Sequence, residues 1–367
     1  MRPSQRFRKA IFPIRRRVNG ILRRPIWEGG PPGGVYSEAE LLRAGMTTGG
    51  FASPIAMPAV PVDSEIRTAG LGQEYHSDWD ALWVCRENAF LAAPTLAHTD
   101  SDGRVCSESL YGPHAWGDPV WRRNGMPHVR ELSGDFTSIV SQWNDGSNYF
   151  HWFLDGLTRL VHLPEFPPDC RILVPSNLPA FAKRSIELLG LTNRVVEARN
   201  EDLRIERYWF AGPTMLSGCP DPIGVNWLRQ AFLRDPQPPQ TRLLYVDRNA
   251  PTRNLTNRAE VRNLFEKRGW EIIDPGQLTF DEQMTTFRGA KAIVGTHGAA
   301  MTNILWAAGG TRVLEFMPSR RRNGCYAGIA LAAGLAHETL ICPSDKRGAM
   351  EVPIPMIARW MELMENG

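Results

Sequence analysis

The sequence predicts an α/β protein whose C-terminal part is built on a parallel sheet. After residue 240, short β-rich apolar runs alternate with helical segments, beginning with the run Arg242 to Val246. Such alternation is typical of a parallel sheet with helical crossovers. The chain has 367 residues, of which 43% are hydrophobic, which is enough to fill a core in each of two domains.

Residues 1–34 form a basic segment, with nine Lys or Arg and no acid between residues 2 and 24. A solvated tail, a segment lying on an anionic membrane and a transit peptide all share this composition, so the three alternatives stay open. The segment ends in a Gly/Pro-rich run, 29–34, which predicts a flexible linker. No stretch reaches the roughly 18 apolar residues of a membrane span. We therefore expect a cytoplasmic protein, in peripheral contact with the inner face of the membrane if residues 2–24 bind lipid.

Residues 35–234 are expected to form an N-terminal domain. Apolar runs predict strands at 81–84, 88–91 and 171–174, and helices are predicted at 180–189 and 227–233. Three prolines among residues 235–240 favour an extended linker, which we take as the domain boundary. The six cysteines favour free thiols, with a Cys85–Cys106 disulfide across a hairpin as the alternative. The D-x-D at 100–102 precedes a glycine and is interpreted as a turn, so no metal is expected.

Residues 241–345 are expected to form the C-terminal domain. Strands are predicted at 242–246, 270–273, 292–295, 313–316 and 339–342, and helices from Asn257 to about 269, from 279 to 289, at 299–308 and at 325–333. Asn257 with Glu260, and Thr279 with Glu282, have the spacing of capping boxes. An amphipathic helix is predicted at 354–365, within a final unit of residues 346–367, and one expected position for it is against the N-terminal domain.

Residues 295–303, GTHGAAMTN, lie where a strand should end and a helix begin. Small residues let a ligand approach the backbone, and the free N–H groups of a helix start favour an anion such as a diphosphate. His297 adds a hydrogen bond or a positive charge, and Asn303 is placed to reach a sugar or a base. The alternative is a plain tight turn. The sequence has neither the P-loop pattern nor a G-x-G-x-x-G after a strand.

Residues 247–257, DRNAPTRNLTN, follow the first strand of the same predicted sheet. Arg248 and Arg253 are suited to hold a leaving diphosphate, although a single arginine is more often a surface charge. Asn257 has a structural alternative as the N-cap of the next helix.

Residues 148–160, NYFHWFLDGLTRL, predict a helix that Asn148 caps. His151, Asp155, Thr158 and His162 share one face of it. A histidine and an aspartate one turn apart are candidates for a general base. The alternative pairs Asp155 with Arg159, and spacing alone favours that alternative.

Together these segments resemble glycosyltransferase family 61, whose bacterial members include proteins labelled capsular polysaccharide biosynthesis proteins. The pattern N-Y-[YF]-H-W-x-x-[DE]-x-x-P-R-L is matched at 148–160, with Thr158 in place of the proline. An arginine followed by R-x-[IL]-x-N is matched by Arg248 and residues 253–257, with Arg258 next where an acid is common. The patterns Q-x-x-x-[FL] and G-x-H-G-A-x-[LM]-T-N and a strand-final glutamate are matched at 283–287, at 295–303 and at Glu315.

The resemblance implies a GT-B architecture, in which two Rossmann-like domains face a cleft and the C-terminal one holds the donor. It implies inverting, metal-independent transfer from a nucleotide sugar, with UDP as the expected nucleotide, and no cofactor. The expected acceptor is a glycan or lipid-linked glycan in capsular or surface polysaccharide biosynthesis. The expected donor-side residues are Arg248, Arg253, Asn257, His297, Gly298, Ala299, Asn303 and Glu315. Asp155 and His151 are the candidates for the base.

Two other functions stay open at this point. One is a non-catalytic glycan-binding or assembly protein that retains the fold. The other is an α/β enzyme for a different anionic ligand, such as a phosphosugar. Nucleic acid is not an expected partner, because the formal net charge of the whole chain is only +3.

Overall fold

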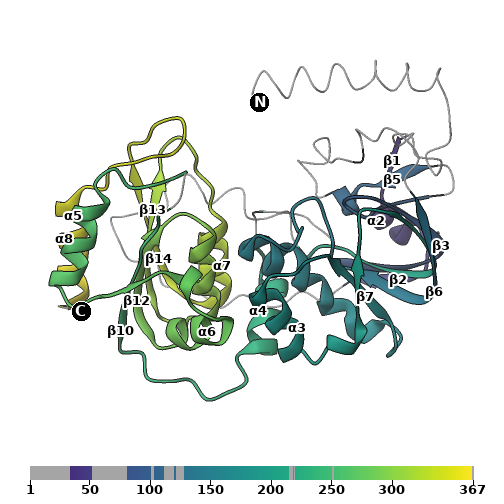
Figure 1. Ribbon diagram of the computed structural model, residues 1–367, viewed down its shortest axis with the longest axis horizontal. Helices are drawn as coiled ribbons and strands as arrows, with labels where there is room; N and C mark the ends of the chain where they lie inside the picture. The colour runs from purple at the N-terminus through teal and green to yellow at the C-terminus, as the bar shows by residue number, and fades with distance from the viewer. Residues whose placement is uncertain are drawn as a thin grey trace.

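In the computed structural model the chain folds into two α/β halves, each with its own sheet (Figure 1). The structure describes residues 34–51, 81–100, 103–110, 120, 128–214, 218, 220–249 and 252–365. The basic segment 2–24, residues 101–102 of the D-x-D and Cys219 lie outside these ranges. Within these ranges, no helix combines the length and the apolar character needed to cross a bilayer.

The first sheet is mixed, and within the described residues its order is β1-β5-β4-β3-β9-β6-β7-β8, with β2 paired to β3. Its strands are β1 (Gly34–Tyr36), β2 (Gly49–Phe51), β3 (Leu82–Ala92), β4 (Ala97–Thr99), β5 (Arg104–Cys106), β6 (Val129–Ser138), β7 (Arg171–Pro175), β8 (Val195–Ala198) and β9 (Asp202–Ala211). Strands β9, β6, β7 and β8 are mutually parallel, whereas β3 is antiparallel to β9. The predicted strands at 81–84 and 88–91 are one strand, because Asn88 adopts a left-handed φ of 50° that asparagine tolerates.

The helices of this half are α2 (Glu38–Arg43), α3 (Ala180–Leu188), α4 (Pro222–Phe232), the π-helix η5 (His151–Gly156), and the 3₁₀ helices η2 (Glu108–Leu110), η6 (Leu157–Glu165) and η7 (Thr192–Arg194). Helix α3 confirms the prediction. Helix α4 begins well before the predicted Trp227, because Asp221 caps the N–H of Gly224 at 3.0 Å and Pro222 takes the first helical position.

The second sheet is entirely parallel, with strand order β11-β10-β12-β13-β14. Its strands are β10 (Arg242–Val246), β11 (Glu271–Ile273), β12 (Ala290–Thr296), β13 (Arg312–Pro318) and β14 (Ala336–Cys342). Counted along the chain this is the order 2-1-3-4-5 of a doubly wound sheet, whose ligands bind where the order reverses. That point lies between β10 and β12, where Val246 is opposite Gly295. The segments that begin at Asp247 and His297 therefore leave the sheet side by side.

The helices of this half are α5 (Arg258–Lys267), α6 (Phe280–Arg288), α7 (Cys325–Ala333), α8 (Ile354–Glu365), and the 3₁₀ helices η8 (Pro275–Gln277) and η9 (Ala299–Trp306). The capping box of Thr279 and Glu282 is confirmed. The predicted box of Asn257 is wrong: Asn257 precedes α5, but its side chain makes no bond to the helix. The helix predicted at 299–308 is 3₁₀ and not α.

Helix α8 packs on the second sheet. Its Ile357, Trp360 and Met361 are buried in an apolar cluster whose members all lie between Tyr245 and Met361. Figure 1 shows α8 beside α5, on the side of this sheet that faces away from the first half. The large ring of Trp360 is therefore buried within the C-terminal half and not against the N-terminal half.

One apolar core joins the two halves, and helices α3, α4, α6 and α7 lie between the two sheets (Figure 1). At its centre are four aromatic rings, Phe153 and Phe232 from the first half and Phe280 and Trp306 from the second. Every pair among them has ring centroids 5.2 to 6.0 Å apart. The core fixes the loops of both halves relative to each other.

Candidate functional site

Two arginines lie beyond the point where the second sheet reverses its strand order, and neither has a carboxylate partner among the described residues. Arg248 donates only to the backbone oxygen of Thr252, at 3.3 and 3.4 Å, and Arg253 has no side-chain partner within the described residues. Burial, and next the charge of Arg253, lower the pKa of Arg248. Arg253 is also held in the left-handed region, at φ 55°, a strained conformation that is concentrated at functional sites.

The one carboxylate that precedes these arginines in the loop is already neutralised. Asp247 is buried, and it accepts hydrogen bonds from Arg258 at 2.7 and 2.8 Å and from Arg262 at 2.9 Å. The departure from the family pattern at Arg258 therefore has a structural role. The positive charge of Arg248 and Arg253 stays available for an anion.

Open backbone amides lie against Arg248. The N–H groups of Gly298, Ala299 and Ala300 at the start of η9 have no hydrogen-bond acceptor within the described residues. A Cβ atom on Gly298 would lie 2.1 Å from Nη1 of Arg248, so only glycine lets the guanidinium approach this closely. The two segments predicted to share a sheet edge thus meet. Together they have the features of an anion site, and we call this place the anion-binding corner.

His297 is held in the same corner by a buried carboxylate. Its Nδ1 is hydrogen-bonded to Glu315 Oε1, and Nε2 of His337 lies 3.0 Å from Glu315 Oε2. Burial alone would raise the pKa of Glu315, but the hydrogen bonds with His297 and His337 lower it below its ordinary value. An ionised carboxylate only accepts, so Nδ1 of His297 carries the proton and Nε2 is left for a ligand. Glu315 is fully buried, and it positions His297.

Tyr326, at the start of α7, connects this corner to the first half. Its hydroxyl donates to the backbone oxygen of Gly298 at 2.6 Å, and its ring centroid lies 5.1 Å from that of His297. On the other side it packs edge-on against Phe150, 6.1 Å away, and Phe150 in turn packs on His151 at 5.3 Å. The anion-binding corner and His151 are therefore separated by two rings.

His151 and Asp155 form a hydrogen-bonded dyad. His151 Nδ1 lies 2.6 Å from Asp155 Oδ2, Asp155 is fully buried, and the His151 side chain is 24% exposed. Both residues lie in the π-helix η5, a type of turn found frequently at functional sites. Asn148 caps this segment, as predicted, by accepting from the N–H of Phe150 at 3.0 Å. Because Asp155 is inaccessible, His151 is the member of the dyad that can meet a substrate.

Two of the predicted donor-side residues are occupied elsewhere. Asn303 is buried, accepts from the hydroxyl of Tyr149 at 2.9 Å and donates to Gln283 at 2.9 Å, so it joins the two halves. Asn257 donates to and accepts from the backbone of Val352, at 2.8 and 3.1 Å. Both amides are therefore engaged in structural hydrogen bonds.

Replacing Tyr149 with phenylalanine is expected to lower the free energy of unfolding by about 1–3 kcal/mol. The Tyr149 hydroxyl also accepts from Nε1 of buried Trp306 at 3.1 Å, so two buried polar groups would lose their partner. Urea unfolding measures the change. Tyr245→Phe is the matched control, since that buried hydroxyl has no hydrogen-bond partner in the described structure. Equal effects of the two variants would contradict the assigned network.

His162, on the same predicted face as His151, is a buried structural residue. Burial lowers its pKa from 6.5 to about 4, against a smaller opposing hydrogen bond with the Gly212 backbone. Between these two pH values His162 binds a proton in the unfolded chain but not in the folded chain. The free energy of unfolding therefore falls as the pH drops from 6.5 towards 4. The expected loss is about 3 kcal/mol. The urea midpoint should depend less steeply on pH in His162→Gln than in the wild type across this range. An identical pH dependence in both proteins would exclude His162 as the cause.

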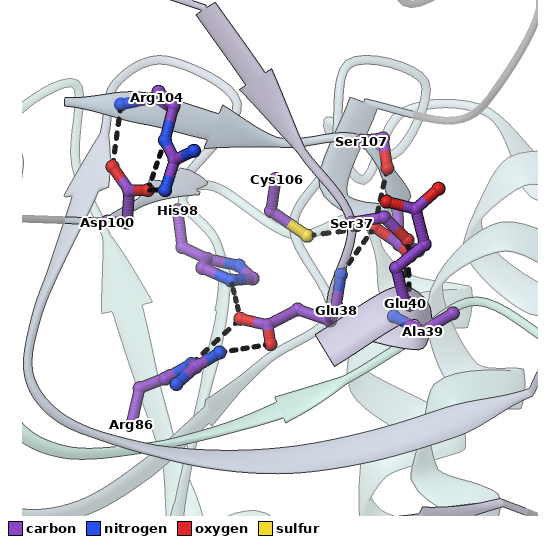
Figure 2. Close-up of polar contacts among 11 residues, drawn as sticks. Ser37, Glu38, Ala39, Glu40, Arg86, His98, Asp100, Arg104, Cys106 and Ser107 are labelled. Atoms are coloured by element: carbon purple, nitrogen blue, oxygen red, sulfur yellow. Dashed lines mark hydrogen bonds and ion pairs between the residues drawn. The ribbon is translucent and has the colours of Figure 1, made fainter. Parts of the chain in front are cut away.

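A second buried polar cluster lies in the first half, where Figure 2 shows Glu38, His98 and Cys106. Their side-chain ligand atoms lie within 4.8 Å of one another, so these residues are the candidate metal ligands of the described chain. His98 and Cys106 converge because β4 and β5 pair antiparallel, with Thr99 opposite Val105. Glu38 reaches them from α2.

The charges of this cluster fit an ion-pair network better than a metal site. Burial raises the pKa of Glu38, but the hydrogen bonds from His98 and Arg86 bring it down to about 2. Burial, and next the charge of Glu108, raise the pKa of the Cys106 thiol well above its usual value. The thiol therefore stays protonated and donates to Glu108 at 3.3 Å, whereas zinc binds the thiolate. Cys85 and Cys106 are both free, so the disulfide alternative is wrong.

The first aspartate of the D-x-D also has a structural role. Asp100 accepts from the N–H of Arg104 at 2.8 Å and pairs with its guanidinium at 2.7 Å. These contacts hold Asp100 at the end of β4 against Arg104 at the start of β5.

Sequence reasoning did not identify Tyr149, Tyr326 and His337 as members of the site. Tyr326 lies in the helix predicted at 325–333, and His337 lies just before the strand predicted at 339–342. No local sequence pattern marks either residue as part of a site. Tyr149 lies in the motif at 148–160, but its partners Asn303 and Trp306 lie more than 150 residues further along the chain.

Residues 149–314 match the family model described as Glycosyltransferase 61. The match includes the dyad, both unpaired arginines and the segment at 295–303, and it ends one residue before Glu315. Among curated proteins, none matches the chain.

Proposed function

This chain belongs to glycosyltransferase family 61, and on that premise we propose that it transfers a sugar from a UDP-sugar to a glycan acceptor. The proposed reaction inverts the anomeric centre and uses no metal ion. We place the reaction in capsular or surface polysaccharide biosynthesis, at the cytoplasmic side of the membrane.

The observation that carries the proposal is the anion-binding corner. Arg248 and Arg253 lack carboxylate partners within the described residues, and the N–H groups of residues 298–300 have no acceptor there. The diphosphate of a nucleotide sugar gains negative charge when the bond to the sugar breaks. Fixed cations and preorganised amides stabilise that charge most strongly as it develops.

His151 is the proposed base. As the acceptor oxygen attacks the anomeric carbon, its proton passes to Nε2 of His151, and the bond from that carbon to the diphosphate oxygen breaks. Asp155 accepts the Nδ1–H of His151, which fixes the tautomer and balances the positive charge that forms. This assignment supports a GT-B-like division of labour, with the donor held by the second half and the base supplied by the first.

A donor panel tests the proposal. We expect the purified protein to release UDP from at least one UDP-sugar in the presence of EDTA. Activity that appears only after addition of manganese would remove the metal-free claim. Stabilisation by phosphosugars and by no nucleotide, in a thermal-shift screen, would favour the other anionic-ligand enzyme.

Gly298→Ala is expected to weaken UDP binding roughly tenfold, which corresponds to about 1.4 kcal/mol. The new methyl group would lie 2.1 Å from the guanidinium of Arg248 and push it out of the corner. The melting temperature should hardly change, because the displaced atoms end a flexible side chain. Gly309→Ala is the control, since its nearest neighbour would be 3.9 Å away. An unchanged dissociation constant for Gly298→Ala would separate Arg248 from the donor.

A further inference from the structure

Five exposed cations border the anion-binding corner. The loops that follow β13 and β14 carry Arg320, Arg321, Arg322, Lys346 and Arg347, which we call the basic rim. All five are exposed, and none of their side chains has an ion pair or hydrogen bond within the described structure. The rim extends along the carboxyl ends of β13 and β14, the same edge of the sheet that holds Arg248 and Arg253.

The basic rim is fixed to the corner. The two loops are bonded to each other, since the N–H of Ser344 donates to Ser319 and that of Arg320 donates to Ser344, each at 3.2 Å. The N–H of Arg253 donates to the backbone oxygen of Arg347 at 3.4 Å. A Cβ atom on Gly348 would lie 2.9 Å from Cγ of Arg253 and 3.7 Å from Cδ of Arg321. The rim therefore continues the positive surface of the two site arginines.

Elsewhere in the described chain, arginines are commonly paired. Those with a carboxylate within salt-bridge distance include Arg86, Arg104, Arg130, Arg184, Arg207, Arg242, Arg258, Arg262 and Arg312. The loop after β14 holds two acids. Asp345 accepts from the backbone N–H groups of Arg347 and Ala349, each at 2.8 Å, and so caps its own turn. Glu351, nearer α8, forms no ion pair with the rim cations within the described residues. Cations that are segregated in this way repel one another, and an extended anion relieves that repulsion.

We propose that the basic rim binds an anionic glycan acceptor, a chain that carries carboxylate groups; this rests on the proposed function. A single diphosphate is already served by Arg248, Arg253 and the open amides, which leaves five cations for a longer anion. The rim is also connected along the chain to the proposed base. Arg322 lies four residues before Tyr326, and the Tyr326 ring contacts Phe150 next to His151. An acceptor whose end reaches His151 extends over the rim.

The composition of the surface favours a glycan over a bilayer. The exposed large hydrophobic side chains of the described residues are Met46, Trp143, Leu331 and Met356, and none lies in the rim loops. Nothing in these loops would insert between lipids, whereas carboxylates spaced along a sugar chain match a row of guanidinium groups.

The test compares the full-length protein with the variant Arg320→Gln/Arg322→Gln/Lys346→Gln. Lys291→Gln is the control, since Lys291 is an exposed, unpaired cation near the start of β12, at the opposite edge of the same sheet. The probes are a fluorescent oligogalacturonate, a neutral dextran oligomer of equal length and phosphatidylglycerol vesicles. Binding of UDP is measured in parallel, so that loss of the donor site is recognised separately.

We expect the oligogalacturonate to bind and the dextran not to bind. The triple variant should raise the dissociation constant at least roughly tenfold and flatten its salt dependence by the equivalent of about three charges, with UDP binding intact. Equal binding of dextran, or no effect of the triple variant, would overturn the proposal. So would binding of the vesicles alone through the rim. Absence of UDP binding in the wild-type protein would instead refute the proposed function.

Discussion

Replacing His151 with alanine is expected to lower kcat for sugar transfer by about 10²- to 10⁴-fold. The imidazole is the accessible member of the dyad, at 24% exposure, and it lies two rings away from the anion-binding corner. Without it, the proposed base for the acceptor proton is lost, while the proposed diphosphate contacts of Arg248 and Arg253 remain. The dissociation constant for UDP should therefore stay as in the wild type. A rapid-quench assay under saturating donor measures the rate of transfer separately from the affinity for UDP.

Asp155→Asn tests the role of the partner. The asparagine removes the negative charge that fixes the tautomer of His151 and balances the imidazolium, so kcat should fall while UDP binding remains. His128→Ala is the control, because that side chain is 79% exposed. If His151→Ala keeps the wild-type kcat, another group is the base, and the dyad only contributes to packing where the two halves meet.

The second sheet was predictable from the sequence because its signals are local. Short apolar runs in the sequence were enough to locate β10, β12 and β13. Helices α7 and α8 have the predicted bounds. The first sheet was less predictable, because β3 depends on long-range pairing with β9, more than one hundred residues further along the chain. No local pattern encodes that partner, and the polar residues around Asn88 resemble a break between strands.

The same distinction applies to the candidate site. The sequence predicted Arg248 and His297 at one sheet edge, because the carboxyl ends of parallel strands lie together. The register of β10 and β12, with Val246 opposite Gly295, places them there. The sequence did not predict how Asn303 and Asn257 are used. Their partners, Tyr149 and Val352, lie 154 and 95 residues away, and an asparagine that joins two halves has the same local sequence as one that binds a ligand.

The basic rim was visible in the sequence only in part. The run of three arginines after β13 is visible in the sequence, but its meaning depends on which charges are paired. Asp247 neutralises Arg258 and Arg262, and Asp345 is used by its own turn. Only the folded arrangement separates compensated arginines from those that are available to an anion.

Arg248→Gln is expected to weaken UDP binding by about 30-fold or more, since loss of a desolvated charge contact costs about 2–5 kcal/mol. The same change should leave the free protein as stable as the wild type or more stable. The charge of Arg248 is partly buried and lies near the charge of Arg253, and no carboxylate of the described residues offsets the cost of desolvation. Removing it relieves that cost, and such a gain in stability with a loss of function is typical of a binding site.

Arg258→Gln provides the opposite case. This arginine pairs with buried Asp247, so its loss leaves a buried carboxylate with a weaker partner set and should lower the melting temperature, with little direct effect on UDP binding. Isothermal titration with UDP and thermal unfolding of the two free variants measure both quantities. If Arg248→Gln loses stability and keeps its affinity for UDP, Arg248 is a structural residue and the donor binds elsewhere. The two arginines lie in one short segment, and only the pairing of their charges makes the expected outcomes differ in sign.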